Sequence, residues 1–252
     1  MEYLIEQLPS GILVFKITRP DKRNAVNFKV MEGLEEAIER AKLADVRALV
    51  ITGEGEQAFC SGGDLSVFHA LRTEEEAHEM LSRMGEILYN LAVLPKPTIA
   101  LINGTAVGGG CEIATACDFR IAKIGAKLGF IQGSLAITTG WGGGTLLFER
   151  IDAAHALKLL TEASIYRAEQ LDHIGMISQV VDEVDITVAE RFLEEERSMQ
   201  SEVLSAYKQI QIRKWQASGL YERMMQEVRQ CAVLWEREEH HQAVDVFLNR
   251  KR

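Results

Sequence analysis

The sequence feature that most constrains this chain is the distribution of its glycines. Eleven of the 20 glycines lie within residues 104–144, and they are most closely spaced at residues 108–110. A smaller glycine group lies within residues 60–65. Each group follows a short apolar run that predicts a buried strand. Because glycine permits conformations and close approaches that a side chain forbids, we expect the backbone to approach a ligand or another segment at both places.

Short apolar runs alternate with helical patterns along most of the chain. The runs that predict strands are residues 12–17, 48–51, 98–102 and 118–122. The patterns that predict helices are residues 27–42, 73–94, the short stretch 113–116 and most of 186–248. Residues 58–65 are expected to form a loop. Alternating strands and helices are typical of an α/β sheet with crossover connections, so this is the fold class that we predict.

The composition excludes several classes of function. Lys and Arg number 28 and Asp and Glu 37 among 252 residues, which gives a formal charge of −9. An acidic chain is a poor partner for nucleic acid, whose phosphates require a basic surface. The sequence shows neither a signal peptide nor an apolar run of about 20 residues, so we expect no membrane span. The four cysteines form no C-x-x-C pattern, which favours free thiols and a cytoplasmic location.

Several catalytic motifs are absent from the sequence. It contains no G-x-G-x-x-G for a dinucleotide, no Gly-Lys pair for a phosphate-binding loop and no G-x-S-x-G for a nucleophilic serine. Residues 238–241, Glu-Glu-His-His, lack the spacing of a zinc-binding helix. We therefore predict a solvated helix face at residues 238–241 and no metal site.

A carboxyl group lies directly beside the second glycine group. Glu112 follows residues 108–110, where a helix is expected to begin. The free N–H groups at a helix start favour negative charge, and two backbone N–H groups aimed at one point form an oxyanion hole. A glutamate beside such a hole can act as a general acid or base. The competing interpretation is that the glycines form only turns and tight packing, with Glu112 an ordinary first-turn residue.

Taken together, the motifs resemble those of the crotonase superfamily, also called the enoyl-CoA hydratase/isomerase family. The resemblance extends nearly from end to end of the chain. The segments that carry it are Arg19-Pro20-x-x-Arg23-Asn24-Ala25, Phe59-Cys60-Ser61-Gly62-Gly63-Asp64-Leu65, Pro95-Lys96-Pro97-Thr98-Ile99-Ala100, Gly108-Gly109-Gly110-Cys111-Glu112, Ala116-Cys117-Asp118-Phe119-Arg120 and Gly140-Trp141-Gly142-Gly143.

The resemblance implies a fold, a substrate and an assembly. The fold is a spiral of ββα units followed by a C-terminal helical region. Residues 1–185 would form the spiral core with the acyl-CoA site, and residues 186–252 the helical region that completes the pocket and a trimer interface. The substrate would be an acyl-CoA thioester, whose own CoA makes a separate cofactor unnecessary. The assembly would be a homotrimer or a hexamer of two trimers.

The resemblance also assigns roles to particular residues. The backbone N–H groups of Gly63 and Gly109 would bind the thioester oxygen, and Glu112 would be the catalytic carboxyl group. Trp141 stands where alanine is commoner in the family, so it would be either a packing residue or a specificity residue. The other positions that match substrate-binding residues are Ser61, Asp64, Leu65 and Ser66 in the first loop, mostly through their backbone, Arg23 for a CoA phosphate, Phe247 for the acyl pocket and Arg250 as a cation for CoA.

The sequence departs from the family at its second catalytic glutamate. Alignment on residues 140–143 puts that position at Gln132, and no Asp or Glu lies between Asp118 and Glu149. An amide does not exchange a proton at neutral pH, but it can orient water or donate a hydrogen bond. Three reactions stay open with Glu112 alone: hydration, double-bond migration, and decarboxylation of a malonyl-type thioester, which forms the enolate without a base.

Hydratase/isomerase-type chemistry is the main prediction. Decarboxylation is the alternative, because residues 60–65, 116–120 and 140–143 also resemble segments of ethylmalonyl- and methylmalonyl-CoA decarboxylases. A third interpretation, from another class, is a non-catalytic relative that binds acyl-CoA or RNA. The acidic charge of the chain argues against RNA.

Overall fold

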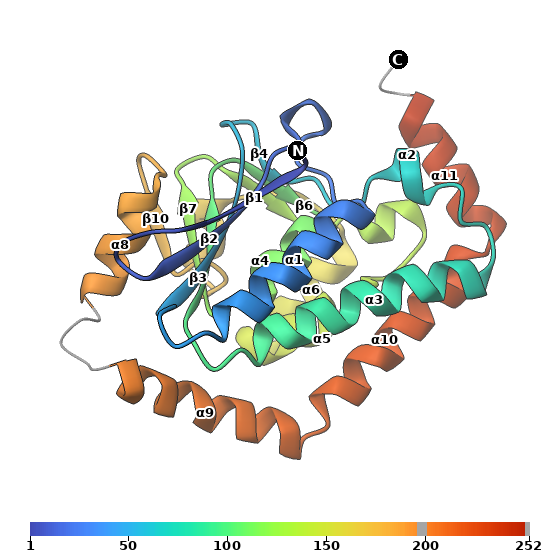
Figure 1. Ribbon diagram of the computed structural model, residues 1–252. Coiled ribbons are helices and arrows are strands. Elements are labelled where there is room, and N and C mark those ends of the chain that lie inside the picture. The colour runs from blue at the N-terminus through green and yellow to red at the C-terminus, as the bar shows by residue number, and fades with distance from the viewer. Residues whose placement is uncertain (196–200, 250–252) are drawn as a thin grey trace.

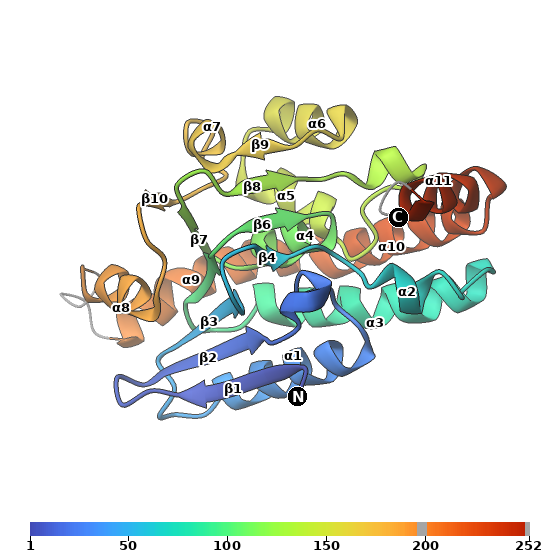
Figure 2. The ribbon, with the colours of Figure 1, turned by 90° about the horizontal axis from the view of Figure 1, so that it is seen from above.

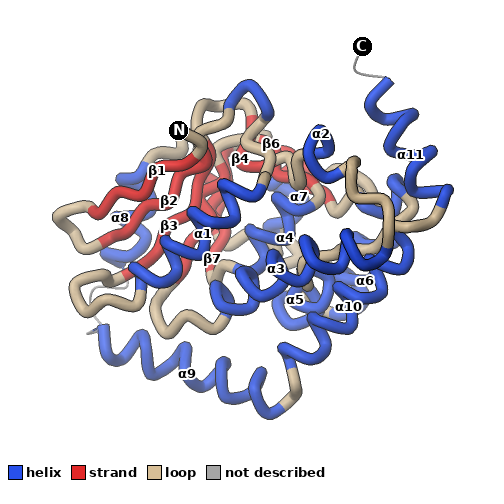
Figure 3. The backbone as a smooth tube through the Cα atoms, turned by 45° about the vertical axis from the view of Figure 1, so that its right-hand side comes forward, coloured by secondary structure: helices blue, strands red, loops and turns tan. Residues whose placement is uncertain are grey.

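The structure is a computed structural model that describes residues 1–195 and 201–249. Its strands form two sheets, and most of its helices gather on one side of them (Figure 1 and Figure 3). In chain order the elements, with 3-10 helices written η, are β1 (Tyr3–Gln7), β2 (Ile12–Ile17), η1 (Pro20–Lys22), α1 (Phe28–Ala41), β3 (Ala48–Gly53), β4 (Ala58–Cys60), α2 (Leu65–Phe68), α3 (Glu74–Ala92), β5 (Thr98–Ile102), β6 (Thr105–Val107), α4 (Gly109–Ala116), β7 (Phe119–Lys123), β8 (Lys127–Gly129), η2 (Gln132–Leu135), α5 (Gly143–Arg150), α6 (Ala153–Glu162), β9 (Tyr166–Arg167), α7 (Ala168–Asp172), β10 (Gln179–Val181), α8 (Ile186–Glu195), α9 (Ser201–Ala217), α10 (Leu220–Trp235) and α11 (Glu238–Asn249).

The larger sheet has the strand order β1-β2-β3-β5-β7-β10. β1 runs antiparallel to β2 at one edge, and the other neighbours are parallel. The strands predicted from the sequence are confirmed as β2, β3, β5 and β7, and the long helices at residues 27–42 and 73–94 as α1 and α3. Because parallel neighbours need a crossover connection rather than a tight turn, the predicted α/β class is confirmed as well.

The smaller sheet has the strand order β4-β6-β8-β9. Three times a strand of the larger sheet is followed by a strand of the smaller one and then by a helix: β3-β4-α2, β5-β6-α4, and β7-β8-α5 with η2 between. The expected loop at residues 58–65 is therefore wrong at its start, since β4 pairs there with β6. A strand of three residues is too short to show a periodic pattern in the sequence.

The central strands of the larger sheet, β2, β3, β5 and β7, are buried on both faces. In β2, Leu13 and Phe15 enter the main core, to which α1, α3, α4, α5 and α10 also contribute. Ile12 and Val14 enter a second core on the opposite face, where they pack with Val188 of α8. Figure 2 shows α8 on the other side of these strands from α3. Because successive side chains of a strand alternate between faces, a strand covered on both sides is apolar throughout, which fits the run at residues 12–15.

The C-terminal helices lie along the helical side of the molecule. α10 packs along α3 and against α5, and α11 packs against η2; Figure 1 shows α9 and α10 running below α3. The solvated face predicted for residues 238–241 is wrong for its two histidines, because His240 and His241 are 1% and 7% exposed. Nδ1 of His240 lies 2.7 Å from the carbonyl oxygen of Leu135 in η2, so docking of α11 covers both rings. Among the described helices, none is both long and apolar enough to cross a bilayer.

Candidate active site

The fold brings the two glycine segments together. They follow β4 and β6, which are parallel neighbours, with Cys60 opposite Ala106. A side-chain carbon built on Gly62 would lie 3.1 Å from the amide nitrogen of Gly109, and one built on Gly110 would lie 2.0 Å from the carbonyl oxygen of Cys60. Gly62 also has a φ of +92°, which L side chains rarely adopt. The close approach of the two segments therefore requires glycine at these positions.

The amides of Gly63 and Gly109 are available as hydrogen-bond donors. The carbonyl of Gly62 accepts from the amide of Val26, and the amide of Asp64 donates to the carbonyl of Val26, both at 2.8 Å. The amide of Gly63, between them, therefore faces away from Val26. Within residues 1–195 and 201–249, neither Gly63 nor Gly109 donates its amide to a protein acceptor. Two unpaired N–H groups on adjoining backbone segments are what an oxyanion hole requires.

Glu112 lies in the first turn of α4 and is 2% exposed. Its Oε2 accepts hydrogen bonds from the amides of Trp141 and Gly143, each at 2.9 Å. Its Oε1 accepts one from Nε2 of Gln132 at 2.8 Å. Gly143 is the first residue of α5 and Trp141 lies two residues before it, so the Glu112 side chain connects the N-terminal end of α4 with that of α5. The amide of Gly140 also donates to Oε1, at 3.4 Å. These bonds hold the carboxyl group in one orientation.

The proton affinity of Glu112 is unusually high for a glutamate. Burial is the largest cause that raises the pKa of Glu112, which reaches about 7, and the negative charge of Glu227 adds to the rise. The amide hydrogen bonds from Gly143, Trp141 and Gly140 lower the pKa, because they stabilise the carboxylate. A group with a pKa near neutrality is present in both protonation states, as general acid–base catalysis requires.

Gln132 lies in η2 and is 8% exposed. Its Nε2 donates a hydrogen bond to Glu112, whereas its Oε1 is buried and has no hydrogen-bond partner among the described residues. A buried acceptor of this kind needs an explanation, such as a bound water or ligand. Gln132 therefore orients the Glu112 carboxyl group and offers one open acceptor, but it carries no exchangeable acid proton.

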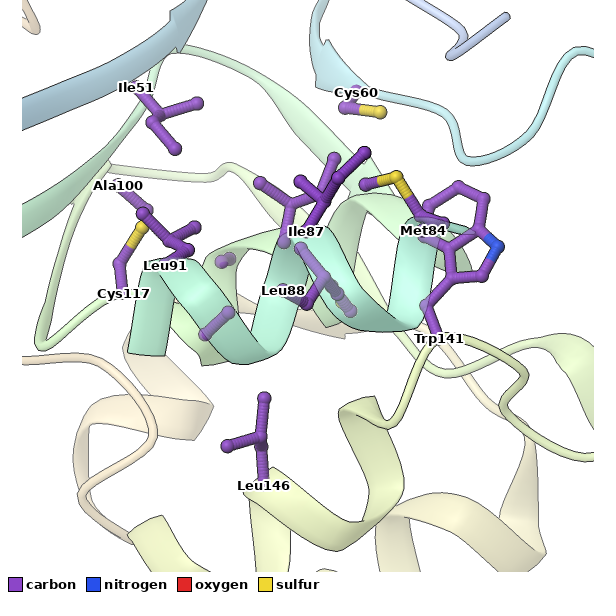
Figure 4. Packing of buried hydrophobic residues seen from close by; sticks show 14 of the residues in the cluster. Ile51, Cys60, Met84, Ile87, Leu88, Leu91, Ala100, Cys117, Trp141 and Leu146 are labelled. Atoms are coloured by element: carbon purple, nitrogen blue, oxygen red, sulfur yellow. The ribbon is translucent and has the colours of Figure 1, made fainter. Parts of the chain in front are cut away.

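Trp141 lies against both glycines of the proposed oxyanion hole. A side-chain carbon built on Gly109 would lie 2.0 Å from Cζ3 of the indole, and one built on Gly63 would lie 3.6 Å from its Cζ2. The carbon on Gly63 would also lie 2.9 Å from Cδ2 of Phe68. Trp141 is 4% exposed, and Figure 4 shows it among the buried apolar residues around α3. The indole and Phe68 therefore form a rigid wall beside the two free amides.

The first loop presents mainly backbone to a ligand. Asp64 is 5% exposed, and its carboxylate accepts from Nη2 of Arg19 at 2.7 Å and from the amide of Ser66 at 3.0 Å. Asp64 thereby caps α2 and has its charge paired within the protein. Ser61 and Leu65 are half-buried and Ser66 is exposed. The side chain of Asp64 is thus engaged in the fold, and contact of this loop with substrate through its backbone stays a prediction.

Of the three remaining candidates for substrate binding, the structure describes Arg23 and Phe247 but not Arg250. Arg23 is exposed next to the first loop, where its carbonyl accepts from the amide of Ser61 at 3.1 Å. Phe247 is half-buried on α11, the helix whose start packs against η2 through His240. Arg250 lies outside the described residues. The roles of all three stay predictions.

One further carboxyl group of this site, that of Glu227 in α10, could not be recognised from the sequence. Its Oε1 accepts from the amide of Gly144 at 3.0 Å, and its Oε2 accepts from the amide and the hydroxyl of Thr145, both at 2.6 Å. Glu227 therefore occupies the same helix start as Glu112. No motif marks it, because it is one acidic residue in a charged amphipathic helix, and only the packing of α10 on α5 brings it to the site.

Comparisons with known proteins agree with this geometry. A sequence model described as enoyl-CoA hydratase/isomerase matches residues 7–252. The chain is 34% identical over 178 residues to an ethylmalonyl-CoA decarboxylase of Xenopus tropicalis, a match that covers 70% of this chain and 59% of that protein. It is also 34% identical over 181 residues to a crotonyl-CoA hydratase of Syntrophomonas wolfei, covering 71% of this chain and 69% of that protein. The chain thus spans less than two thirds of the length of the decarboxylase that it matches.

The fold is shared with a solved structure. The crystal structure of an enoyl-CoA hydratase from Bacillus halodurans matches with a TM-score of 0.86 at 22% sequence identity, over 98% of this chain and 100% of that chain. This likeness confirms the predicted spiral of ββα units with helices at its C-terminal end. The structural likeness, the family match from residue 7 to residue 252 and the paired glycine segments lead to the same conclusion: this chain belongs to the enoyl-CoA hydratase/isomerase family.

Proposed function

We propose that this chain is an enzyme that processes acyl-CoA thioesters by stabilising a thioester enolate. The amides of Gly63 and Gly109 bind the oxygen that becomes negative, and Glu112 moves the proton. The observation that carries this proposal is the combination of two unpaired amides on adjoining segments with one buried glutamate whose pKa is raised to about 7. Hydrogen bonds aimed at the developing charge contribute several kcal/mol in such sites, roughly 3–4 for each donor.

The main reaction that we propose is of the hydratase/isomerase type, with Glu112 as the single acid/base. In double-bond migration, the Glu112 carboxylate takes a proton from the carbon next to the thioester carbonyl. The electron pair moves to the carbonyl oxygen, and the same carboxyl group returns the proton further along the chain. In hydration, Glu112 takes a proton from water as the water oxygen bonds to the β-carbon, and the proton is returned to the α-carbon. The open Oε1 of Gln132 offers an acceptor for that water.

Decarboxylation of a malonyl-type thioester is the second candidate. There the bond to the substrate carboxylate breaks, its electron pair forms the enolate, carbon dioxide leaves, and a protonated Glu112 gives its proton to the α-carbon. Two observations favour it. A carboxyl group with a pKa of about 7 is substantially protonated at neutral pH, and Gln132 puts an uncharged group where a second glutamate would repel the substrate carboxylate.

The proposal extends to the substrate and the assembly. Because the wall formed by Trp141 and Phe68 stands against the hole, we propose a short acyl group. CoA is held by the backbone of residues 61–66 with Arg23, and Phe247 and Arg250 close the pocket in a homotrimer or a hexamer. The steps above need no cofactor besides the CoA of the substrate, since two amides and one carboxyl group supply every proton and charge contact. We keep the cytoplasm as the proposed location.

The test is incubation of the purified chain with three classes of thioester: 2-enoyl-CoA, 3-enoyl-CoA and malonyl-type CoA with short branches. Mass spectrometry reports gain of water or loss of carbon dioxide, and absorbance reports formation of the conjugated 2-enoyl product. We expect one class to turn over and Glu112→Gln to abolish the turnover. Glu149→Gln, a carboxyl group at the other end of α5, is the matched control and retains activity.

If the chain binds CoA thioesters but converts no class, the enzymatic proposal fails in favour of a non-catalytic acyl-CoA-binding relative. If instead it shifts labelled RNA in a salt-dependent manner, the nucleic-acid-binding interpretation replaces both. If Glu112→Gln turns over substrate at the rate of the unaltered chain, the catalytic role of Glu112 is wrong.

A further inference from the structure

Two buried carboxyl groups share the start of α5. Glu112 reaches it from α4 and accepts from the amides of Trp141 and Gly143. Glu227 reaches it from α10 and accepts from the amides of Gly144 and Thr145. The four donors are therefore divided in order along the chain, the first two to Glu112 and the last two to Glu227.

This division explains how the amide groups at the start of α5 find hydrogen-bond acceptors. The N-cap of α5 is Gly142, which has a φ of +83° and no side chain that could accept from the first turn. The first amides of a helix have no intrahelical partner, and here they point into the protein. The two carboxyl groups replace the missing cap, and both are stabilised by the partial positive charge of the helix end.

Because they share this helix start, the carboxyl groups of Glu112 and Glu227 also interact electrostatically. The charge that most affects Glu112 is that of Glu227, and it raises the pKa of Glu112. The other titratable groups that face Glu112 are the thiols of Cys111 in α4 and Cys231 in α10, whose pKa values burial raises, so that they stay uncharged near neutral pH. The neighbour in η2, Gln132, does not titrate. Two carboxyl groups that interact in this way titrate as a pair rather than independently.

We infer that Glu227 is a positioning residue for Glu112: from α10 it holds the first turn of α5, whose amides in turn hold the Glu112 carboxyl group. When Glu227 is charged, its negative charge adds to the rise in the pKa of Glu112 that burial causes, and burial raises the pKa of Glu227 as well. This inference rests on the proposed role of Glu112 as the acid/base. It assigns Glu227 no contact with substrate.

Carboxyl titration tests the inference without reference to turnover. The full chain is labelled with ¹³C at the glutamate carboxyl carbons, and the Glu112 signal is identified by its absence in Glu112→Gln. In the unaltered chain, we expect a midpoint near 7, as for the pKa of Glu112. In Glu227→Gln, the midpoint moves down but stays above the ordinary glutamate value of about 4.3, because burial, the largest cause of the rise, is unchanged. An unmoved midpoint overturns the electrostatic half of the inference.

Activity measurements test the positioning half. Glu227→Asp keeps the charge but shortens the side chain, so we expect the midpoint to stay near that of the unaltered chain while kcat falls, on the order of tenfold, because the first turn of α5 is displaced. Undiminished kcat in this variant overturns the positioning role. In Glu227→Gln, the pH profile of kcat moves to lower pH together with the carboxyl midpoint.

Glu149→Gln is the matched control for both measurements. Glu149 also ties α5 to the C-terminal helices, through Arg223 Nη2 at 2.9 Å and Trp215 Nε1 at 3.0 Å, but it does not contact the start of α5. It should leave the Glu112 midpoint and kcat unchanged; an equal shift there would mean that general loosening of α10 explains the effect. Failure of the proposed function has a different signature, which is full activity of Glu112→Gln while the carboxyl midpoint still depends on Glu227.

Discussion

Replacing Gly109 with alanine tests whether the Trp141 indole closes the space beside the free amides. The added carbon would lie 2.0 Å from Cζ3 of the indole, whereas an ordinary carbon–carbon contact is about 3.5–4.0 Å. The ring must therefore move by roughly 1.5–2 Å, although Trp141 is buried. Overpacking of a dense core lowers the free energy of unfolding by about 1–3 kcal/mol, and this is the loss that we expect for Gly109→Ala.

The double variant separates this contact from a general weakening of α4. Trp141→Ala alone leaves a cavity and should lower the free energy of unfolding by about 3–5 kcal/mol. In the double variant the new methyl group enters that cavity, so the combined loss should fall short of the sum by about 1–3 kcal/mol. Urea unfolding followed by far-UV circular dichroism, rather than by tryptophan fluorescence, gives the free energy of unfolding of the two single variants and the double variant. Gly133→Ala is the control, because its added carbon would lie 3.3 Å from Cβ of Ala163 and needs only a slight adjustment. Additive losses for Gly109 and Trp141 would refute the reasoning.

Three further predictions follow from buried contacts. If Trp141 limits the acyl group, Trp141→Ala should raise kcat/KM for longer acyl chains relative to the shortest, on the order of tenfold; an unchanged ratio across chain lengths contradicts this. Asp118→Asn should lower the free energy of unfolding by about 3–5 kcal/mol, because Lys208 Nζ lies 2.6 Å from Oδ2 of Asp118 with both side chains largely buried; a loss below about 1 kcal/mol in urea unfolding would show that the pair is not needed. Burial acts to raise the pKa of Asp64, but the hydrogen bonds from Ser66 and Arg19 outweigh the effect of burial and hold the pKa of Asp64 below its usual value. The stabilisation by this pair is therefore present above the unfolded pKa of about 3.9 and is lost as the pH falls through the lower folded pKa. Arg19→Met should lower the free energy of unfolding at pH 7 by about 3 kcal/mol, and by progressively less toward pH 3. A difference between the variant and the unaltered chain that does not depend on pH would contradict the assignment.

Local patterns in the sequence predicted the elements that form the frame of the molecule. The apolar runs of β2, β3, β5 and β7 and the helical spacing of α1 and α3 are properties of neighbouring residues, so they are visible before folding. The two glycine segments were also visible, because a position that tolerates only glycine constrains the residue itself. The same positions carried the family resemblance that the matched sequence model confirms.

Other features depend on contacts between distant segments, and local pattern could not predict them. β4 became a strand because β6 lies beside it. His240 and His241 became buried because α11 docks on η2. Neither contact has a periodic signal of its own, since each is decided by the partner segment.

The sequence by itself determined the fold class, the family, the paired glycine segments and the presence of Glu112 without a second glutamate at Gln132. Only the tertiary structure decided which groups surround Glu112: the indole of Trp141 against the two glycines, and the carboxyl group of Glu227 on the same helix start. The physical reason is that proton affinity and pocket shape depend on burial and on charges within a few ångströms. Those neighbours come from the segment just before α5 and from α10, which are far from Glu112 in the chain and meet it only in the folded core.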